Sequence, residues 1–258
     1  MTGSSPEELP PDESVRAVGE TVLAVHYRTD PAAIERRLPP PLELIRGGEV
    51  MVYVVKAVIN DTDQRATLGS VDPHATSFSQ FCVTLPCEYD GRKGTYFTFH
   101  RVDGDTQLGT VRAMGYDSDL ADVGLTRYPP ELRPFASSGV DRRVSGTVVD
   151  ESGTIATVDI DLESEGTPDD LPWPFILTVF SHRSIADETS GTGRTKLADD
   201  VLLETHESES ISGVHIGEPT LELETAALAD VRPRDILGGY YFEIGLVLSG
   251  LERINGVD

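Results

Sequence analysis

Short apolar runs, rich in β-branched side chains and separated by polar turns, recur along this chain. The run at 50–60, VMVYVVKAVIN, is typical of a buried strand, because β-branched and aromatic residues pack well on a pleated surface. Segments 78–102 and 142–165 each predict two strands joined by a tight turn, Asp-Gly in the first and Glu-Ser-Gly in the second. Further strands are predicted within 20–30, 172–185, 201–224 and 236–254.

Helix signals are few. Asp30 can cap the start of a short helix, and Pro31 suits the first helical position. The prolines at 39–41 end this helix. Residues 117–134, broken by aspartates and prolines, predict turns and irregular chain. Because strands dominate and do not alternate with helices, we predict a mainly β (α+β) fold, an antiparallel sheet with a few short helices.

The pattern predicts one domain behind an arm. Residues 1–17 are acidic, proline-rich and without period, which predicts a flexible arm, and 18–258 fit a single core. No apolar stretch approaches the roughly 18 residues that span a bilayer, and the N-terminus lacks the apolar region of a signal peptide. We therefore expect a cytoplasmic protein without a membrane partner.

The charge balance narrows the partners. With 44 Asp and Glu against 21 Lys and Arg, the net charge is −23, and such a field repels nucleic acids and anionic membranes. Only three of the cationic residues are lysines, Lys56, Lys93 and Lys196. An acidic, lysine-poor surface suits high salt, where screening removes self-repulsion. We predict a halophilic protein whose folded state needs molar salt.

Metal and cofactor motifs are missing from the pattern. The six histidines contain no H-x-x-x-H pair, and Cys82 and Cys87 lie an odd five positions apart, which places them on opposite faces of a strand. The glycine-rich GTGR at 191–194 lacks the strand-then-helix context of a phosphate-binding loop, and no G-x-S-x-G elbow is present. We expect two buried free thiols, no metal and no cofactor.

Lys56 stands out because it interrupts an apolar strand. If its ammonium group faced a dry cavity, desolvation would lower its pKa and make it a candidate nucleophile or imine former. The alternative is that the amine reaches the edge of the sheet and is solvated there.

Three blocks of the chain together resemble the acetoacetate decarboxylase family. They are VHYRTDPAAIERRLPPPLEL at 25–44, FSQFCVTLPCEYDGRKGTYFTFHRVDGD at 78–105 and TAALADVRPRDILGGYYFE at 225–243. The resemblance implies an antiparallel sheet closed into a barrel, packed by a few helices, in a homo-oligomer. It also implies an active site at the segment VRAMGYDSDLAD, 111–122.

That segment departs from the family pattern. In the family an arginine leads to an aromatic residue, a proline, two adjacent lysines and a leucine; the first lysine forms a Schiff base with a β-keto acid. Here Arg112 matches the arginine and Tyr116 the aromatic residue, but Asp117, Ser118 and Asp119 stand where the family has Pro-Lys-Lys. Neither Ser118 nor Asp119 can form an iminium.

The resemblance places Gln80 where the family has an active-site glutamate. We expect Arg112 to be buried and paired with Asp117, Asp119 or a ligand carboxylate, since a buried unpaired guanidinium is costly. The candidate residues are then Asp119, Ser118, Tyr116 and Lys56 for catalysis, and Arg112 and Gln80 for substrate binding.

Three functions remain open. The first is a diverged lyase or enolising enzyme that binds a small oxo acid or related carboxylate and uses a carboxylate such as Asp119 as general base, without imine chemistry. The second is a non-catalytic protein that binds a small ligand on the same scaffold. The third is a true carboxy-lyase acting on a β-keto acid, for which only Lys56 could supply the amine.

Overall fold

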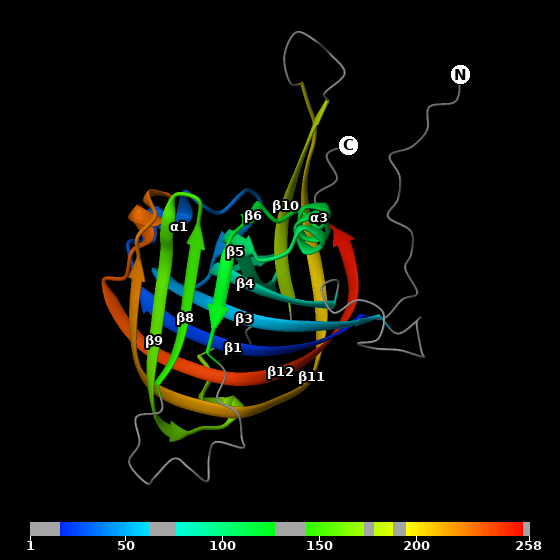
Figure 1. The fold of residues 1–258 in the computed structure, drawn as a ribbon. Helices are drawn as coiled ribbons and strands as arrows, with labels where there is room; N and C mark the ends of the chain where they lie inside the picture. The colour runs from blue at the N-terminus through cyan, green and yellow to red at the C-terminus, as the bar shows by residue number, and fades with distance from the viewer. Residues whose placement is uncertain (1–15, 62–75, 127–142, 173–177, 188–194, 255–258) are drawn as a thin grey trace, which may run out of the picture.

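The computed structural model describes residues 16–61, 76–126, 143–172, 178–187 and 195–254 (Figure 1). Strands dominate it, as predicted. They are β1 (Arg16–Arg28), β2 (Glu43–Leu44), β3 (Glu49–Asp61), β4 (Ser77–Tyr89), β5 (Arg92–Val102), β6 (Ser118–Leu120), β7 (Asp122–Leu125), β8 (Arg143–Asp150), β9 (Gly153–Glu165), β10 (Thr178–Asp187), β11 (Thr195–Leu223) and β12 (Asp235–Arg253). The helices are α1 (Pro31–Glu35) and α3 (Asp105–Ala113), with 3-10 turns η2 (Pro168–Asp170) and η3 (Ala226–Val231).

Both predicted hairpins are confirmed. β4 and β5 are joined at Asp90 and Gly91, whose φ angles of 49° and 75° are the two positive values that a tight hairpin turn requires. β8 and β9 are joined in the same region as predicted, with Asp150 opposite Gly153. The Asp-Gly signal was sufficient because few other residue pairs tolerate this backbone conformation.

The first helix is also confirmed, whereas the next segments differ from the prediction. The Asp30 side chain accepts a hydrogen bond from the Ala32 backbone N at 3.0 Å and so caps α1. α3 was not expected, since its sequence has little apolar periodicity; it buries Gln107 and Val111. Residues 118–125, predicted to be irregular, form β6 and β7, because pairing with β5 and β8 overrides their weak strand propensity.

The strands form one twelve-stranded mixed sheet. Ten of them follow the order β10-β5-β4-β3-β1-β12-β11-β9-β8-β7, while β2 pairs with β4 and β6 with β5 beside this path. The prediction of a mainly β fold is confirmed, but the prediction of an antiparallel sheet closed into a barrel is wrong. The pairs β10–β5 and β5–β6 are parallel, and the sheet ends openly at β7. The physical reason is the length of β11: it pairs with β10 through 195–205 and with β9 through 215–223, so the sheet forks there.

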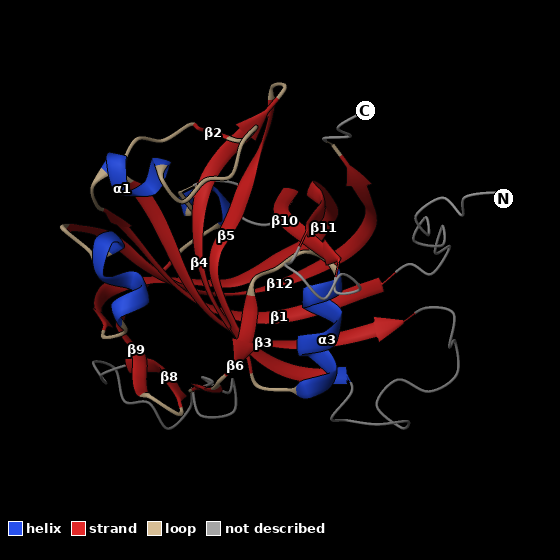
Figure 2. Ribbon diagram, turned by 90° about the horizontal axis from the view of Figure 1, so that it is seen from above, coloured by secondary structure: helices blue, strands red, loops and turns tan. Residues whose placement is uncertain are grey.

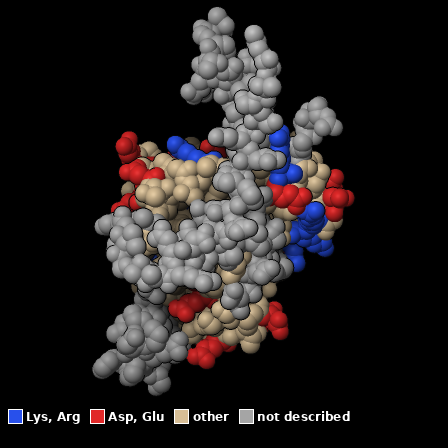
Figure 3. All heavy atoms as spheres, turned by 90° about the vertical axis from the view of Figure 1, so that its right-hand side faces the viewer, with Lys and Arg blue, Asp and Glu red and all other residues tan. Residues whose placement is uncertain are grey.

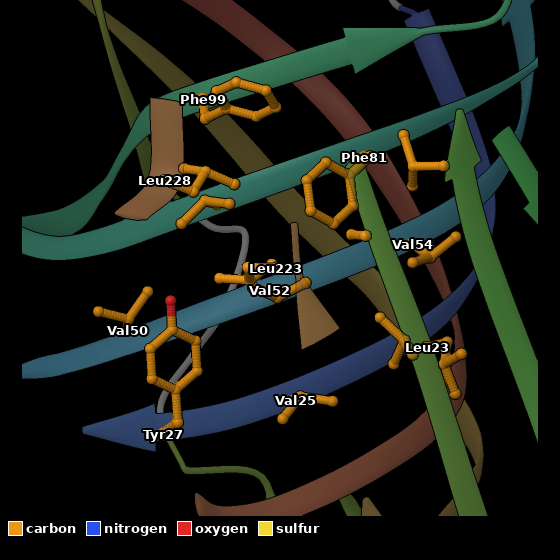
Figure 4. Close-up of a cluster of buried hydrophobic side chains, with 14 of the residues drawn as sticks. Leu23, Val25, Tyr27, Val50, Val52, Val54, Phe81, Phe99, Leu223 and Leu228 are labelled. Carbon is orange, nitrogen blue, oxygen red and sulfur yellow. The ribbon is translucent and has the colours of Figure 1, made fainter. Parts of the chain in front are cut away.

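The two faces of the central strands β1, β3 and β4 pack against different partners. We call the first the apolar face; β8, β9 and η3 cover it, and its side chains form a large hydrophobic cluster (Figure 4). On β1, β3 and β4 these include Leu23, Val25, Val52, Val54 and Phe81. We call the other the mixed face; with β12 and β11 it forms a second cluster that includes Val22, Ala24, Tyr53, Cys82 and Phe242.

α3 lies beside the mixed face and away from α1, as the view from above shows (Figure 2). Its Val111 packs with Val102 of β5, Tyr116 and Val179 of β10. The segment that follows α3 runs directly into β6, which pairs with β5. The family-like segment 111–122 is therefore held between α3 and the end of β5.

Other predictions concern the ends of the domain, the thiols and the surface. β1 begins at Arg16, two residues before the predicted start of the domain, while 1–15, 62–75 and the GTGR segment lie outside the described residues.

Cys82 and Cys87 are buried free thiols, as predicted. Within the described parts of the chain, no helix is long and apolar enough to cross a membrane. On the face shown in Figure 3, acidic side chains form separate groups, some of them beside basic ones.

Candidate functional site

A chain of four hydrogen-bonded polar residues crosses the mixed face. Ser118 Oγ contacts His100 Nδ1, His100 Nε2 lies 3.0 Å from Gln80 Oε1, and Gln80 Nε2 lies 3.4 Å from Glu20 Oε1. We call Glu20, Gln80, His100 and Ser118 the polar chain. His100 and Ser118 are each only 1% exposed, and Gln80 and Glu20 are partly buried. Buried polar groups in this arrangement satisfy one another rather than water.

Strand pairing explains why these residues meet. On β4 and β5, His100 lies opposite Cys82, so its ring is diagonal to Gln80 on the same face. The parallel pairing of β5 with β6 sets Ser118 beside His100. Glu20 enters from β1, two strands away from β4. Four strands therefore bring together residues that lie far apart in the sequence.

The charge on Glu20 sets the direction of the hydrogen bonds. A carboxylate can only accept, so the Gln80 amide NH₂ points to Glu20 and its carbonyl oxygen points to His100. His100 Nε2 then donates its proton to Gln80, which leaves Nδ1 without a proton. The Ser118 hydroxyl must donate to this nitrogen. The result is a serine hydroxyl aimed at the basic nitrogen of a neutral imidazole.

The surroundings keep His100 neutral. Burial, and secondarily the positive charge of Arg101, lower its pKa from 6.5 to about 3. The His100 ring also lies tilted against Tyr116, at 5.5 Å between ring centroids, and against Phe97, at 5.7 Å. Tyr116 is buried, as a catalytic candidate would be, but it serves here as one wall beside the imidazole.

Asp119 and Arg112 lie on the outside of the same segment. Arg112 donates from Nε to the Ser118 backbone oxygen at 2.8 Å and from Nη2 to Asp119 Oδ1 at 2.8 Å, while Arg101 Nη2 lies 3.4 Å from Asp119 Oδ2. The predicted pairing of Arg112 with Asp119 is confirmed. The predicted burial of Arg112 is wrong, because its side chain is 52% exposed at the end of α3. Arg112 therefore fixes the backbone at Ser118 from outside.

Lys56 lies on the other side of the sheet. Its neighbours across the strands are Thr21 and Ser79, and its Nζ lies 3.3 Å from Ser79 Oγ. It lines a hollow of about 370 Å³ together with, among others, Glu20 of the polar chain, Val58, Ser210 and Glu243. Lys56 is partly buried and follows the alternation of the apolar face, to which Val52 and Val54 of the same strand belong.

His100 and Glu20 were missed in the sequence. Gln80, Ser118 and Tyr116 were named, but nothing local to His100 marks it, since it lies near the end of an ordinary hairpin strand. Gln80 and His100 lie on the two strands of the predicted hairpin, and the alternation of side chains along each strand could have placed both residues on one face. Glu20 sits near the start of a strand, where acidic residues are common. In the described parts of the chain no cluster of three metal-ligating side chains occurs.

The fold and the site define a mixed-sheet protein with a buried polar chain on one face of the sheet. The family model described as acetoacetate decarboxylase (ADC) matches residues 1–256. The chain belongs to the acetoacetate decarboxylase family. No curated protein matches its sequence.

Solved structures share this fold at low sequence identity. An acetoacetate decarboxylase-like enzyme from Sphingomonas wittichii RW1 matches with a TM-score of 0.81 and 21% identity over 99% of this chain and 100% of that chain. The enduracididine biosynthesis enzyme MppR complexed with pyruvate matches with a TM-score of 0.77 and 17% identity over 100% of both chains. Acetoacetate decarboxylase from Legionella pneumophila subsp. pneumophila str. Philadelphia 1 matches with a TM-score of 0.73 and 17% identity over 99% and 92%.

Proposed function

We propose that the mixed face binds a small oxo acid beside Ser118 and His100, and that the protein transfers a proton at the carbon next to its carbonyl group. The observation that carries this proposal is the polar chain, which ends in a serine hydroxyl on the segment where the family resemblance places the active site. A structural neighbour, MppR, is complexed with pyruvate, a small oxo acid, and this supports the substrate class.

The proton transfer follows from the direction of the hydrogen bonds. Ser118 Oγ would take the proton from the substrate carbon and pass its own proton to His100 Nδ1. The resulting imidazolium would be stabilised through Gln80 by the negative charge of Glu20. Because Asp119 is held outside by two arginines, the base is His100 rather than the carboxylate that the sequence had favoured.

The proposed chemistry uses no imine. An imine needs a primary amine whose free base is populated near neutral pH, and an ordinary lysine supplies little of it. Lys56 lines the hollow on the other side of the sheet, and Lys93 is exposed near the β4–β5 turn; the Lys196 side chain is outside the described residues. Ser118 takes the position of the Schiff-base lysine in the resemblance.

A non-catalytic, ligand-binding role is the second candidate. It is favoured by the low pKa of His100, because a nitrogen that holds a proton weakly is a weak base. In that case the polar chain would orient a bound oxo acid through the Ser118 hydroxyl without turnover. A β-keto acid carboxy-lyase remains the third candidate and would need the amine of Lys56. For any of the three we also expect a homo-oligomer, which light scattering would measure.

Proton exchange in heavy water tests the proposal. Pyruvate is incubated with the protein, and NMR follows replacement of its methyl hydrogens by deuterium. We expect exchange above the buffer rate, loss of at least about tenfold in Ser118→Ala, and little change in Ser181→Ala. Ser181 is a matched control, since it is also 1% exposed but donates to the Met114 backbone oxygen instead of a histidine. Binding without exchange supports the non-catalytic role.

Borohydride reduction tests the absence of an imine. Acetoacetate or pyruvate is added with borohydride, the protein is digested, and the three lysine peptides are analysed by mass spectrometry, with a parallel assay for released carbon dioxide. We expect no reduced adduct on Lys56, Lys93 or Lys196. A reduced adduct on Lys56 together with turnover would establish the carboxy-lyase role and would overturn this part of the proposal.

A further inference from the structure

We propose that Ser118 is also a nucleophile that accepts acyl groups from small activated esters, with His100 as its general base and Gln80 as the residue that positions His100. This activity is separate from oxo acid binding. It rests on the order of the contacts alone: a hydroxyl on an imidazole nitrogen, and the second imidazole nitrogen on a fixed polar side chain. Nucleophilic serine sites are recognised by this order rather than by sequence position.

Each of the three roles has a matching contact. Ser118 Oγ–H donates to the unprotonated Nδ1 of His100, so the proton to be removed already points at the base. His100 Nε2 donates to Gln80 Oε1 at 3.0 Å, which holds the tautomer in which Nδ1 is basic. Gln80 is held in this orientation by Glu20. If its amide group were flipped, the Gln80 carbonyl oxygen would face the Glu20 carboxylate, and neither oxygen could donate a hydrogen bond.

Burial restricts the size of the acyl group. Ser118 and His100 are each 1% exposed, and Phe97 and Tyr116 flank the imidazole at centroid distances of 5.7 and 5.5 Å. A flat, two-carbon acyl group needs less displacement of these rings than a longer one. The substrate class is therefore an ester of a short carboxylic acid, and acetyl is the group to test.

The reaction balances with water as the co-reactant. Ser118 Oγ forms a bond to the ester carbonyl carbon while its proton moves to His100 Nδ1, and the carbon–oxygen bond to the leaving alcohol breaks. His100 gives that proton to the leaving oxygen, which leaves an acetyl-serine. A water molecule then attacks the acetyl carbon, His100 takes its proton, and acetate leaves as Ser118 Oγ recovers the proton. No oxidant or reductant takes part.

The probe is p-nitrophenyl acetate on the full-length wild-type protein. Trypsin releases the peptide 113–127, in which Ser118 is the single serine. We expect a rapid release of up to one p-nitrophenolate per chain and a mass increase of one acetyl group that fragmentation places on Ser118. Ser118→Ala should lose both signals, and Ser181→Ala should keep them. Acetylation elsewhere in the folded protein, or none at Ser118, overturns the proposal.

A cysteine variant tests the same contact without relying on acetyl lifetime. In Ser118→Cys, His100 should take the thiol proton as the sulfur attacks, so the new thiol should react with iodoacetamide at least about tenfold faster than Cys82 and Cys87, whose burial raises their thiol pKa values. Equal or slower labelling of position 118 in the folded variant contradicts the base role of His100. The wild-type acetylation result stands whether or not this variant folds.

Gln80 is tested as a positioning residue. Gln80→Leu removes the acceptor of His100 Nε2 and should lower the acetylation rate by at least about tenfold, while Gln80→Glu restores an acceptor and should recover it in part. Recovery with a pH profile shifted upward supports positioning, because a carboxylate beside the imidazole raises its pKa. Equal rates in both variants would overturn this role. Deuterium exchange into pyruvate on the same samples reports separately on the proposed function.

Discussion

The apolar and mixed faces of β1, β3 and β4 share one backbone and differ in what they bury. On the apolar face, residues such as Val54 and Phe81 are fully buried among other hydrophobic side chains (Figure 4). On the mixed face, the strands that bury Val22 and Cys82 also carry Gln80, whose neighbour His100 lies against Phe97 and Tyr116. The backbone therefore serves stability on one side and can carry chemistry on the other.

The difference has an energetic meaning. Burying a polar group costs free energy unless it is hydrogen-bonded, so a protein that needed only stability would fill both faces with hydrophobic residues. The mixed face instead keeps four polar side chains whose bonds depend on one another. The mixed face is therefore where function is expected, and the apolar face supplies a matched background for testing it.

The largest expected effect comes from salt, which acts on both faces together. The acidic side chains that give the net charge of −23 repel one another at low ionic strength, where the Debye length is about 10 Å or more. We expect the folded state to be lost in low salt and restored in molar salt. Thermal unfolding across a salt series measures this, and a midpoint that does not move between low and molar salt would refute the halophilic interpretation.

Phe81→Ala should separate the two faces most clearly. Phe81 is fully buried on the apolar face, and removing its ring should lower the free energy of unfolding by about 3–5 kcal/mol. The reaction at Ser118 should persist in the fraction that remains folded.

Ser118→Ala should instead abolish acetylation at a smaller cost in stability. The unpaired His100 nitrogen should lower the free energy of unfolding by about 1–3 kcal/mol. Chemical denaturation provides both free energies.

Two glycine substitutions refine the comparison. A Cβ on Gly146 of β8 would lie 2.8 Å from Val54 Cγ2, so Gly146→Ala should force the apolar face apart and cost about 1–3 kcal/mol. Gly109 lies in α3 and a Cβ there would have no atom within 4 Å, so Gly109→Ala should stabilise the protein by about 0.4–1 kcal/mol. A Gly146→Ala variant as stable as the wild type would show that β8 does not pack as described.

The fold was largely predictable from the sequence, and the apolar face more so than the mixed face. β-branched runs and the Asp-Gly turn specify strands and hairpins locally, which is why β3, β4 and β5 were predicted correctly. The fork of the sheet depends on how the long β11 divides its edge between β9 and β10, and no local pattern encodes that division.

The site was only partly predictable for the same reason. Ser118 and Gln80 were found through the family resemblance, whereas His100 and Glu20 join them only through pairing across β1, β4, β5 and β6. The error over Arg112 also has a physical cause. The unpredicted α3 places Arg112 on its outer side, where the guanidinium can bond to the Ser118 carbonyl and Asp119 without being buried.

A pH dependence of stability follows from His100. Its pKa is about 3 in the folded protein and 6.5 as an unperturbed side chain, so the unfolded chain binds the proton first. Stability should be at its plateau above about pH 6.5 and should fall toward pH 4.5, by up to about 1.4 kcal/mol per pH unit for this residue. Arg101 lowers the pKa further.

Denaturation between about pH 4.5 and 7 in wild type and His100→Gln measures this slope. The variant should keep a smaller slope of the same sign, since burial also lowers the pKa of His26. The pKa values of carboxyl groups such as Asp161 and Asp230 are lowered from 3.8, so their loss of stability begins at lower pH. Identical slopes in the two proteins would mean that His100 is not the buried, neutral group described.

The central claim is that the mixed face holds a neutral His100 whose unprotonated Nδ1 receives the Ser118 hydroxyl beside a bound oxo acid. Nitrogen NMR of ¹⁵N-histidine-labelled protein, with His100→Gln to assign the signal, measures this directly. We expect His100 to show a protonated Nε2 and an unprotonated Nδ1, unchanged from about pH 7 to about pH 5, with a shift when pyruvate is added. A His100 ring that is protonated on Nδ1, titrates near its ordinary pKa of about 6.5, or ignores pyruvate while another histidine responds would contradict the account.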